Sequence, residues 1–126
     1  ALAAGGEVIG VIPQLLMDKE VGHAGLSELH VVDTMSQRKW LMGELSDAFI
    51  ALPGGFGTLD ELFEVTTWAE LGIHDNPIGL LDVDGWFGHL RAHVEQGVAL
   101  GLIQAQHRQL WKIDDDADAL LTALGV

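Results

Sequence analysis

The sequence predicts an α/β protein built on a mostly parallel sheet, and three observations lead to this prediction. Short, continuous apolar runs alternate with longer segments in which apolar residues recur at helical spacing. The apolar runs lack a regular alternation with polar residues, as is typical of strands buried on both faces. Glycine, proline and aspartate separate the segments. We therefore expect one Rossmann-like, doubly wound domain over residues 1–126, with helices on both faces of the sheet.

The individual elements follow from these patterns. The predicted strands cover residues 7–12, 29–32, 48–52, 77–81 and 110–113. The predicted helices cover residues 36–45, 58–71, 86–100 and 115–124, and residues 1–4 are expected to be a last helical turn ended by Gly5 and Gly6. Residues 14–27 are mixed and predict an irregular connection, whereas residues 82–85 predict a turn. The inner face of the helix over 58–71 is expected to consist of Leu59, Leu62, Phe63, Val65, Thr66 and Ala69.

Composition narrows the class of protein. The chain has 126 residues, of which 48% are hydrophobic, and this is enough for one packed core. No apolar run approaches the roughly 18–20 residues that a membrane span needs. The first residues lack the features of a signal peptide, and there is no cysteine for a disulfide or a thiolate metal site. A cytoplasmic location is therefore expected.

Charge limits the partners. Nineteen acidic and six basic residues give a formal net charge of −13, which repels nucleic acids and anionic membranes. We expect neither as a partner. Arg38 and Lys39 are the only adjacent basic residues, so a phosphorylated ligand would be sought near them. For such a pair a solvated charged face is the competing interpretation.

The strongest local signal is the run from Pro53 to Glu61, which leads from an apolar strand into a helix. Its three glycines allow a sharp turn, and the first N–H groups of the helix favour an anion such as phosphate. A purely structural tight turn is the alternative. The run is neither a dinucleotide fingerprint nor a P-loop, because the third glycine and the Gly-Lys-Ser/Thr are missing.

Two interpretations of Glu61 remain open. Thr58 and Glu61 have the spacing of a capping box, in which Thr58 is the N-cap and Glu61 bonds back to its N–H. Glu61 is equally a candidate catalytic carboxylate. Substitution by glutamine separates the two, because glutamine can cap a helix but cannot act as a carboxylate.

No metal ion or cofactor is expected. Asp82 and Asp84 lie in an ordinary turn after a strand, and the six histidines show no ligand pattern. His89 and His93 are four residues apart on a predicted helix but lack the glutamate of a zincin motif.

The spaced motifs resemble the LONELY GUY family of phosphoribohydrolases, many of whose members were once described as possible lysine decarboxylases. The resemblance rests on Asp33-x-Met35-x-x-Arg38-Lys39, the run from Gly54 to Glu61, and Glu64-Val-x-Thr-Trp68, with further similarity along nearly the whole chain. Members have an upstream strand–helix–strand region with another glycine-rich loop. We expect this region to be missing here, since only a helix tail precedes the first strand.

The resemblance implies an activity and a set of site residues. Members hydrolyse the N-glycosidic bond of cytokinin riboside 5′-monophosphates, so AMP or N6-prenyl-AMP is the implied substrate. Arg38 would be the catalytic arginine and Glu61 the catalytic carboxylate. The implied substrate-binding residues are Glu20, Met35, Lys39, Gly54, Gly55, Phe56, Gly57, Thr58, Asp60 and Thr67. A homodimer or a higher homo-oligomer is also implied.

The implied chemistry is compatible with these residue types. Breaking a C1′–N bond passes through an oxocarbenium-like ribose that a carboxylate stabilises. Arginine keeps its proton, so Arg38 would act electrostatically on the phosphate or on the leaving base.

Two other functions fit the sequence less well. A non-catalytic carrier of nucleotides or of the molybdenum cofactor would use a similar glycine-rich loop, but it does not need Arg38, Lys39 and Glu61 together. A lysine decarboxylase dependent on pyridoxal phosphate is disfavoured, because Lys19, Lys39 and Lys112 lie in no Schiff-base motif.

Overall fold

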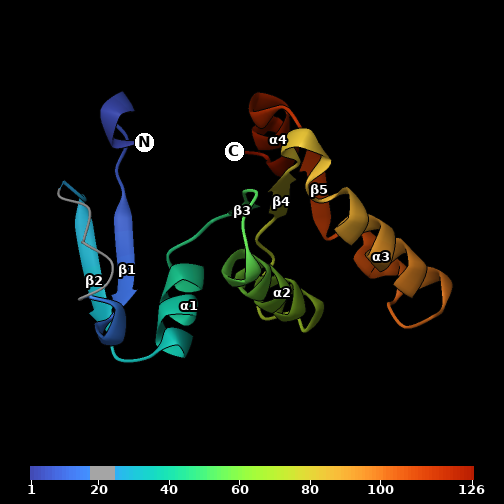
Figure 1. The fold of residues 1–126 in the computed structure, drawn as a ribbon, viewed down its shortest axis with the longest axis horizontal. Coiled ribbons are helices and arrows are strands. Elements are labelled where there is room, and N and C mark those ends of the chain that lie inside the picture. Colours follow the sequence, from blue (N-terminus) through green and yellow to red (C-terminus); the bar gives the residue numbers. More distant parts are fainter. Residues whose placement is uncertain (18–24) are drawn as a thin grey trace. The chain divides into compact units, whose positions relative to one another are not determined.

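The chain forms two compact units, Ala1–Leu45 and Ser46–Val126, each described here by itself. A computed structural model describes residues 1–17 and 25–126 (Figure 1). Both units are of the α/β type, and every strand pairing in them is parallel. The predicted α/β class with parallel strands is confirmed. No helix in the described part of the chain is long and apolar enough to cross a membrane.

The first unit is a two-stranded parallel sheet with one helix packed on it. Its elements are η1 (Leu2–Ala4), β1 (Ile9–Pro13), η2 (Gln14–Leu16), β2 (Glu28–Val32) and α1 (Met35–Glu44). Ile9 of β1 lies opposite Glu28 of β2, and α1 contacts both strands. The short helix η1 ends at Gly5, whose φ of 80° is the left-handed conformation expected of a glycine after a helical turn.

The second unit is a three-stranded parallel sheet in the order β3-β4-β5. Its elements are β3 (Phe49–Ala51), α2 (Phe56–Glu70), β4 (Ile78–Leu81), η3 (Val83–Gly85), α3 (Gly88–Ala99), η4 (Ala105–Gln109), β5 (Trp111–Asp114) and α4 (Ala117–Leu124). Every predicted strand and helix from residue 7 onward is present, with bounds that differ by at most two residues. The short helix η4 was not predicted.

Helices cover both faces of this sheet, as expected of a doubly wound fold. Side chains alternate along a strand, so Ile78 and Leu80 point to one face of β4 and Gly79 to the other. Ile78 and Leu80 form the buried core with Leu62 of α2 and with Phe87. On the opposite face, a Cβ at position 79 would lie 2.9 Å from Leu124 Cδ1, so α4 rests directly on the backbone of β4.

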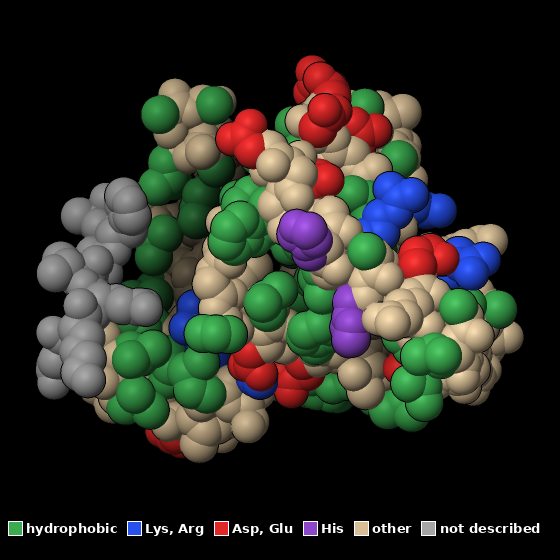
Figure 2. Space-filling view, turned by 45° about the vertical axis from the view of Figure 1, so that its right-hand side comes forward, with side chains coloured by type: hydrophobic (Ala, Val, Ile, Leu, Met, Phe, Trp, Pro, Cys, Tyr) green, Lys and Arg blue, Asp and Glu red, His purple; other side chains and the backbone are tan. Residues whose placement is uncertain are grey.

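The inner face of α2 agrees with the prediction except at Phe63. Leu62 is buried, and Leu59, Val65 and Ala69 pack against the core. Phe63 is 44% exposed, because it lies at the margin of this face, where its ring approaches that of Trp111 at a centroid distance of 6.3 Å. The expectation that Phe63 is an inward residue was therefore wrong. Other hydrophobic side chains are also exposed, as the space-filling view shows (Figure 2).

Candidate functional site

The glycine-rich run forms a turn from β3 into α2. Gly55 is the N-cap of α2, with φ −91° and ψ −155°, and the helix begins at Phe56. The first intrahelical hydrogen bond runs from the N–H of Leu59 to the carbonyl of Gly55, at 3.2 Å. The N–H groups of Phe56, Gly57 and Thr58 thus precede the hydrogen-bonded part of the helix. Such groups form the positive end of the helix dipole and attract anions.

The capping-box interpretation of Thr58 and Glu61 was wrong. The helix begins at Phe56 and Gly55 occupies the N-cap, so Thr58 is the third helical residue. No side chain in the described part of the chain caps this helix. The reason is local. Gly55 is itself the extended N-cap, and Glu61 lies six residues further along the helix, too far to bond back to the N–H of the cap. Glu61 is a half-buried residue of the second turn, and its carboxylate has no capping role.

Packing within the chain requires a glycine at one position of this turn and not at the other two. A Cβ at Gly54 would lie 2.2 Å from Thr58 Oγ1 and 3.0 Å from Thr58 Cβ, so packing within the chain excludes a larger residue there. At Gly55 and Gly57 a Cβ would meet no described atom within 4 Å, and neither residue has a positive φ. Neither internal packing nor backbone conformation requires a glycine at 55 or 57. The space above them is open, which suits a ligand that approaches the backbone closely.

Three predicted residues, Gly57, Asp60 and Glu61, lie within about 100° of one another around α2. At 100° per residue, Gly57 and Glu61 point in nearly the same direction, and Asp60 and Thr67 lie along the edge of that side. The core residue Leu62 points away from it. Phe56, at the entrance, is 92% exposed. The hydroxyl of Thr67 donates to the carbonyl of Phe63 at 2.8 Å, and this bond holds its side chain against the helix. Gly57, Asp60 and Glu61 therefore share one side of α2, while Phe56, Thr58 and Thr67 flank it.

In the first unit, Arg38 and Lys39 lie near the start of α1. This helix begins with a true capping box: Thr34 Oγ1 accepts from the N–H of Gln37 at 3.1 Å, and Gln37 Oε1 accepts from the N–H of Thr34 at 3.2 Å. Met35, the first helical residue, is partly exposed.

The guanidinium of Arg38 is the notable group on α1. Its Nε is buried and makes no hydrogen bond within the part of the chain that the structure describes. A buried donor of this kind is costly unless an acceptor reaches it, so it suits a residue that receives an anionic ligand. Arg38 and Lys39 belong to one unit, and Glu61 with the glycine-rich turn belongs to the other. Glu20 lies outside the described residues.

Side chains that sequence reasoning left without a role hold α2 in place. His74 Nε2 donates to the carbonyl of Val65 at 2.9 Å, while its Nδ1 accepts from the N–H of Asn76 at 3.1 Å. The indole N–H of Trp111 donates to Thr66 Oγ1 at 2.8 Å. No local pattern marks these contacts, because they join residues 9 and 45 positions apart.

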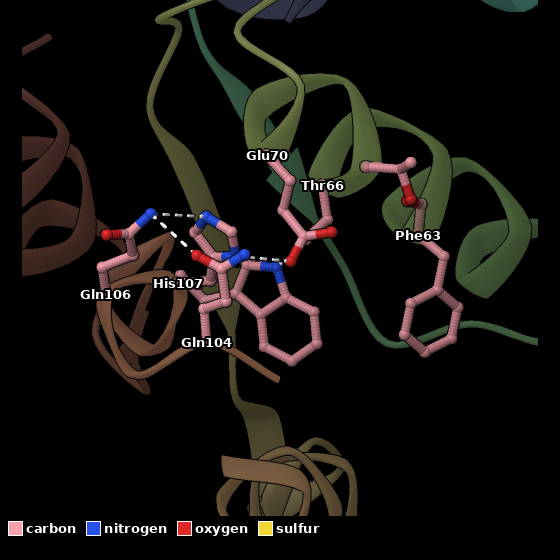
Figure 3. Close-up of polar contacts among 8 residues, drawn as sticks. Phe63, Thr66, Glu70, Gln104, Gln106 and His107 are labelled. Carbon is pink, nitrogen blue, oxygen red and sulfur yellow. Dashed lines mark hydrogen bonds and ion pairs between the residues drawn. The ribbon is translucent and has the colours of Figure 1, made fainter. Parts of the chain in front are cut away.

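The C-terminal end of α2 is also tied to η4. Figure 3 shows Glu70 and His107 turned toward each other, with Gln104 and Gln106 beside His107. The distance from His107 Nδ1 to Glu70 Oε1 is 2.7 Å. The helix that carries Glu61 is therefore braced along its length, which suits a site that needs a fixed carboxylate. No cluster of three or more possible metal ligands occurs among residues 1–17 and 25–126.

Known proteins resemble this chain closely. A family described as "Possible lysine decarboxylase" matches residues 1–124. The chain is 51% identical over 120 residues to the probable cytokinin riboside 5′-monophosphate phosphoribohydrolase LOGL9 of Oryza sativa subsp. japonica, a match that covers 95% of the chain and 53% of that protein. It is 46% identical over 121 residues to the cytokinin riboside 5′-monophosphate phosphoribohydrolase LOG5 of Arabidopsis thaliana, covering 96% of the chain and 53% of that protein. The chain thus spans about half the length of the curated relatives it matches.

Proposed function

This chain belongs to the LONELY GUY family, the family described as possible lysine decarboxylases, and on that premise we propose that it supplies the site of a nucleotide phosphoribohydrolase. The substrate would be a cytokinin riboside 5′-monophosphate, an N6-prenylated form of AMP, or AMP itself. The products would be the free base and ribose 5-phosphate. Relatives about half identical to this chain bear the name of that activity, which supports the proposal.

The reaction breaks one bond and forms another. The C1′–N bond of the nucleotide breaks with its electron pair moving to the base. A water oxygen then bonds to C1′, and the proton that this water loses balances the one that the base gains. The transition state carries positive charge on the ribose, which a nearby carboxylate stabilises. Glu61 is the proposed carboxylate, because it projects from the same side of α2 as Gly57 and takes no part in capping.

The 5′-phosphate would lie over the start of α2. The N–H groups of Phe56, Gly57 and Thr58 would donate to its oxygens, because they lie in the first turn of α2. Gly54 allows Thr58 to fold back over the turn, and Gly55 and Gly57 leave room for the phosphate itself. Arg38 would neutralise the phosphate or the charge that develops on the leaving base, with Lys39 beside it. Glu20, Met35, Phe56, Asp60 and Thr67 are proposed to line the rest of the nucleotide site.

One observation carries the proposal: the turn into α2 has two glycines that the chain itself does not require, followed by a glutamate that the helix does not use. Packing within the described residues explains neither Gly57 nor Glu61. A ligand with a phosphate at the helix entrance and a ribose beside Glu61 explains both.

The test is a turnover assay with purified chain. AMP and N6-isopentenyl-AMP are incubated with it, and the free base and ribose 5-phosphate are quantified by chromatography. Release of both products supports the proposal. Nucleotide binding without products would instead support the carrier function. When the assay is repeated with Glu61→Gln, Glu44→Gln is the matched control, because Glu44 is an exposed helical glutamate at the far end of α1.

The assembly and location of the protein belong to the same proposal. We propose a single functional domain that works as a homodimer or a higher homo-oligomer in the cytoplasm. A small nucleotide would be its ligand, with no nucleic-acid or membrane partner, and its net charge of −13 supports this last point. Light scattering at several concentrations of the chain tests the oligomeric state.

A further inference from the structure

Two histidines on α3 differ from the other histidines that the structure describes. His30 contacts Glu28 at 2.8 Å, His107 contacts Glu70, and His74 uses both ring nitrogens in hydrogen bonds. His89 and His93 are exposed, and neither makes a hydrogen bond or an ion pair with any described residue. Their ring nitrogens are therefore available to an external ligand.

The helix places these two imidazoles next to each other. Both residues lie within the regular α-helix Gly88–Ala99, four positions apart. Residues at this spacing project from the same face, with Cβ atoms roughly 5–6 Å apart. Two imidazoles at that separation can both reach one metal ion, since a metal–nitrogen bond to histidine is about 2.0–2.1 Å long.

The surroundings do not oppose a cation at this position. Arg91 lies between the histidines in sequence, but two residues along a helix it points to the opposite side. Glu95 is engaged by Arg108 at 3.0 Å. Ala92, beside the pair, is small and exposed. The net charge of −13 also raises the local concentration of cations around the whole molecule.

In contrast to the sequence-based expectation of no metal ion, we propose that His89 and His93 together bind one divalent transition-metal ion on the outer surface of α3. Two neutral imidazoles favour the later first-row ions, with Cu²⁺ bound most tightly and Ni²⁺ and Zn²⁺ less tightly. Water would complete the coordination. Leu90 stands where a zincin has its glutamate, so the site binds metal without activating water for hydrolysis. The proposal is independent of the nucleotide reaction.

The test uses the full chain without a histidine tag, freed of metal by dialysis against EDTA. Titration with Cu²⁺ is followed by calorimetry and by electron paramagnetic resonance, which reports the nitrogens bound to the copper. We expect one ion bound by two nitrogens. His89→Ala and His93→Ala should each weaken binding by roughly 10²-fold, since the second imidazole acts at a high effective concentration.

Two further variants make the result decisive. Arg91→His combined with His93→Ala keeps the number of exposed histidines but puts them on opposite sides of α3, so it should bind as weakly as the single variants. His30→Ala should leave the affinity unchanged. Equal affinity in His89→Ala and in the unaltered chain, or a loss caused by His30→Ala, would overturn the proposal. Circular dichroism of each variant checks that the fold is retained.

Discussion

Two helices of this protein begin with the same sequence signature and use it differently. Thr34 is the N-cap of α1 and Gln37 its third residue, whereas Thr58 and Glu61 both lie inside α2; both pairs have the spacing of a capping box. In α1 the box forms, and both side chains bond to the backbone at the helix start. In α2 the helix begins earlier, at Phe56, and Gly55 is the N-cap. The same spacing therefore marks a helix start in one place and the proposed active site in the other.

The difference comes from what precedes each threonine. Asp33, which is not a glycine, precedes Thr34. The helix α1 starts directly after Thr34, whose hydroxyl oxygen accepts the N–H of Gln37. Gly54 and Gly55 precede the second pair. Gly55 is the N-cap, so α2 begins at Phe56 without a side-chain acceptor from Thr58. Gln37 is thus committed to structure, whereas Glu61 is left for another role. Four experiments can break or sharpen this contrast.

The largest effect is expected from Glu61→Gln. Loss of the carboxylate should lower turnover of N6-isopentenyl-AMP by about 10²–10⁴-fold, the usual range for a positioned acid or base. The midpoint of thermal unfolding should not change, because Glu61 makes no capping bond. Initial rates and a melting curve measure the two. An active variant, or one that unfolds more easily, would contradict the assignment.

Gly57→Ala should have the next largest effect. A methyl group in the path of the phosphate should cost about 1–3 kcal/mol of substrate affinity, as an overpacked contact does. Gly88→Ala is the matched control, since Gly88 also lies in the first turn of a helix with open space around its Cβ. Alanine has the higher helix propensity, so both variants should be as stable as the unaltered chain or more stable by up to about 1 kcal/mol. The measurement is the KM for substrate of Gly57→Ala and of Gly88→Ala. Equal KM values in the two variants would mean that no ligand occupies the space above Gly57.

The two threonines should differ in stability. Thr34→Ala removes the side-chain acceptor of a working cap and should lower the free energy of unfolding by about 1 kcal/mol. Thr58→Ala removes no cap and should change it by less than about 0.5 kcal/mol. Urea denaturation of both variants gives the comparison. A larger loss in Thr58→Ala than in Thr34→Ala would restore the capping-box interpretation of α2.

The smallest effect is expected from Gln37→Glu. A glutamate can accept the same hydrogen bonds from Asp33 and Thr34, and its negative charge near the helix start should add about 0.3–1 kcal/mol of stability. Turnover should be unchanged. This substitution is the reverse of Glu61→Gln, so a loss of activity here would show that the two regions are not functionally distinct.

Much of the fold could be predicted from the sequence because its elements carry local signals. The apolar runs at 48–52 and 77–81 became β3 and β4, and the amphipathic segment at 58–71 became α2. The errors lie where local signals compete. The Thr58–Glu61 spacing suggested a helix start at 58, but the glycines before it moved the start to Phe56. The short helix η4 follows no periodic pattern, and its contacts with α2 come from distant residues.

The candidate site was predictable only in part. The glycine-rich turn could be predicted, because three glycines where an apolar run leads into a helical segment indicate a sharp turn and a helix start that favours an anion. The bracing of α2 by His74 and Trp111 could not be found, because hydrogen bonds across 9 and 45 positions leave no trace in spacing. Nor could sequence separate Gly54, which the chain needs for its own packing, from Gly57, which it does not.

The contact between α4 and Gly79 has a consequence for how the second unit opens. β4 is paired on both edges and carries Ile78 and Leu80, with exposed fractions of 1% and 0%. Its other face is shielded by leucines of α4 that sit where a side chain at 79 would be. Amide protons of β4 can reach solvent only after α4 has lifted away, so in deuterium they should exchange last and together with those of α4. A bulkier residue at 79 would wedge the two apart and let that exchange begin from the C-terminal helix.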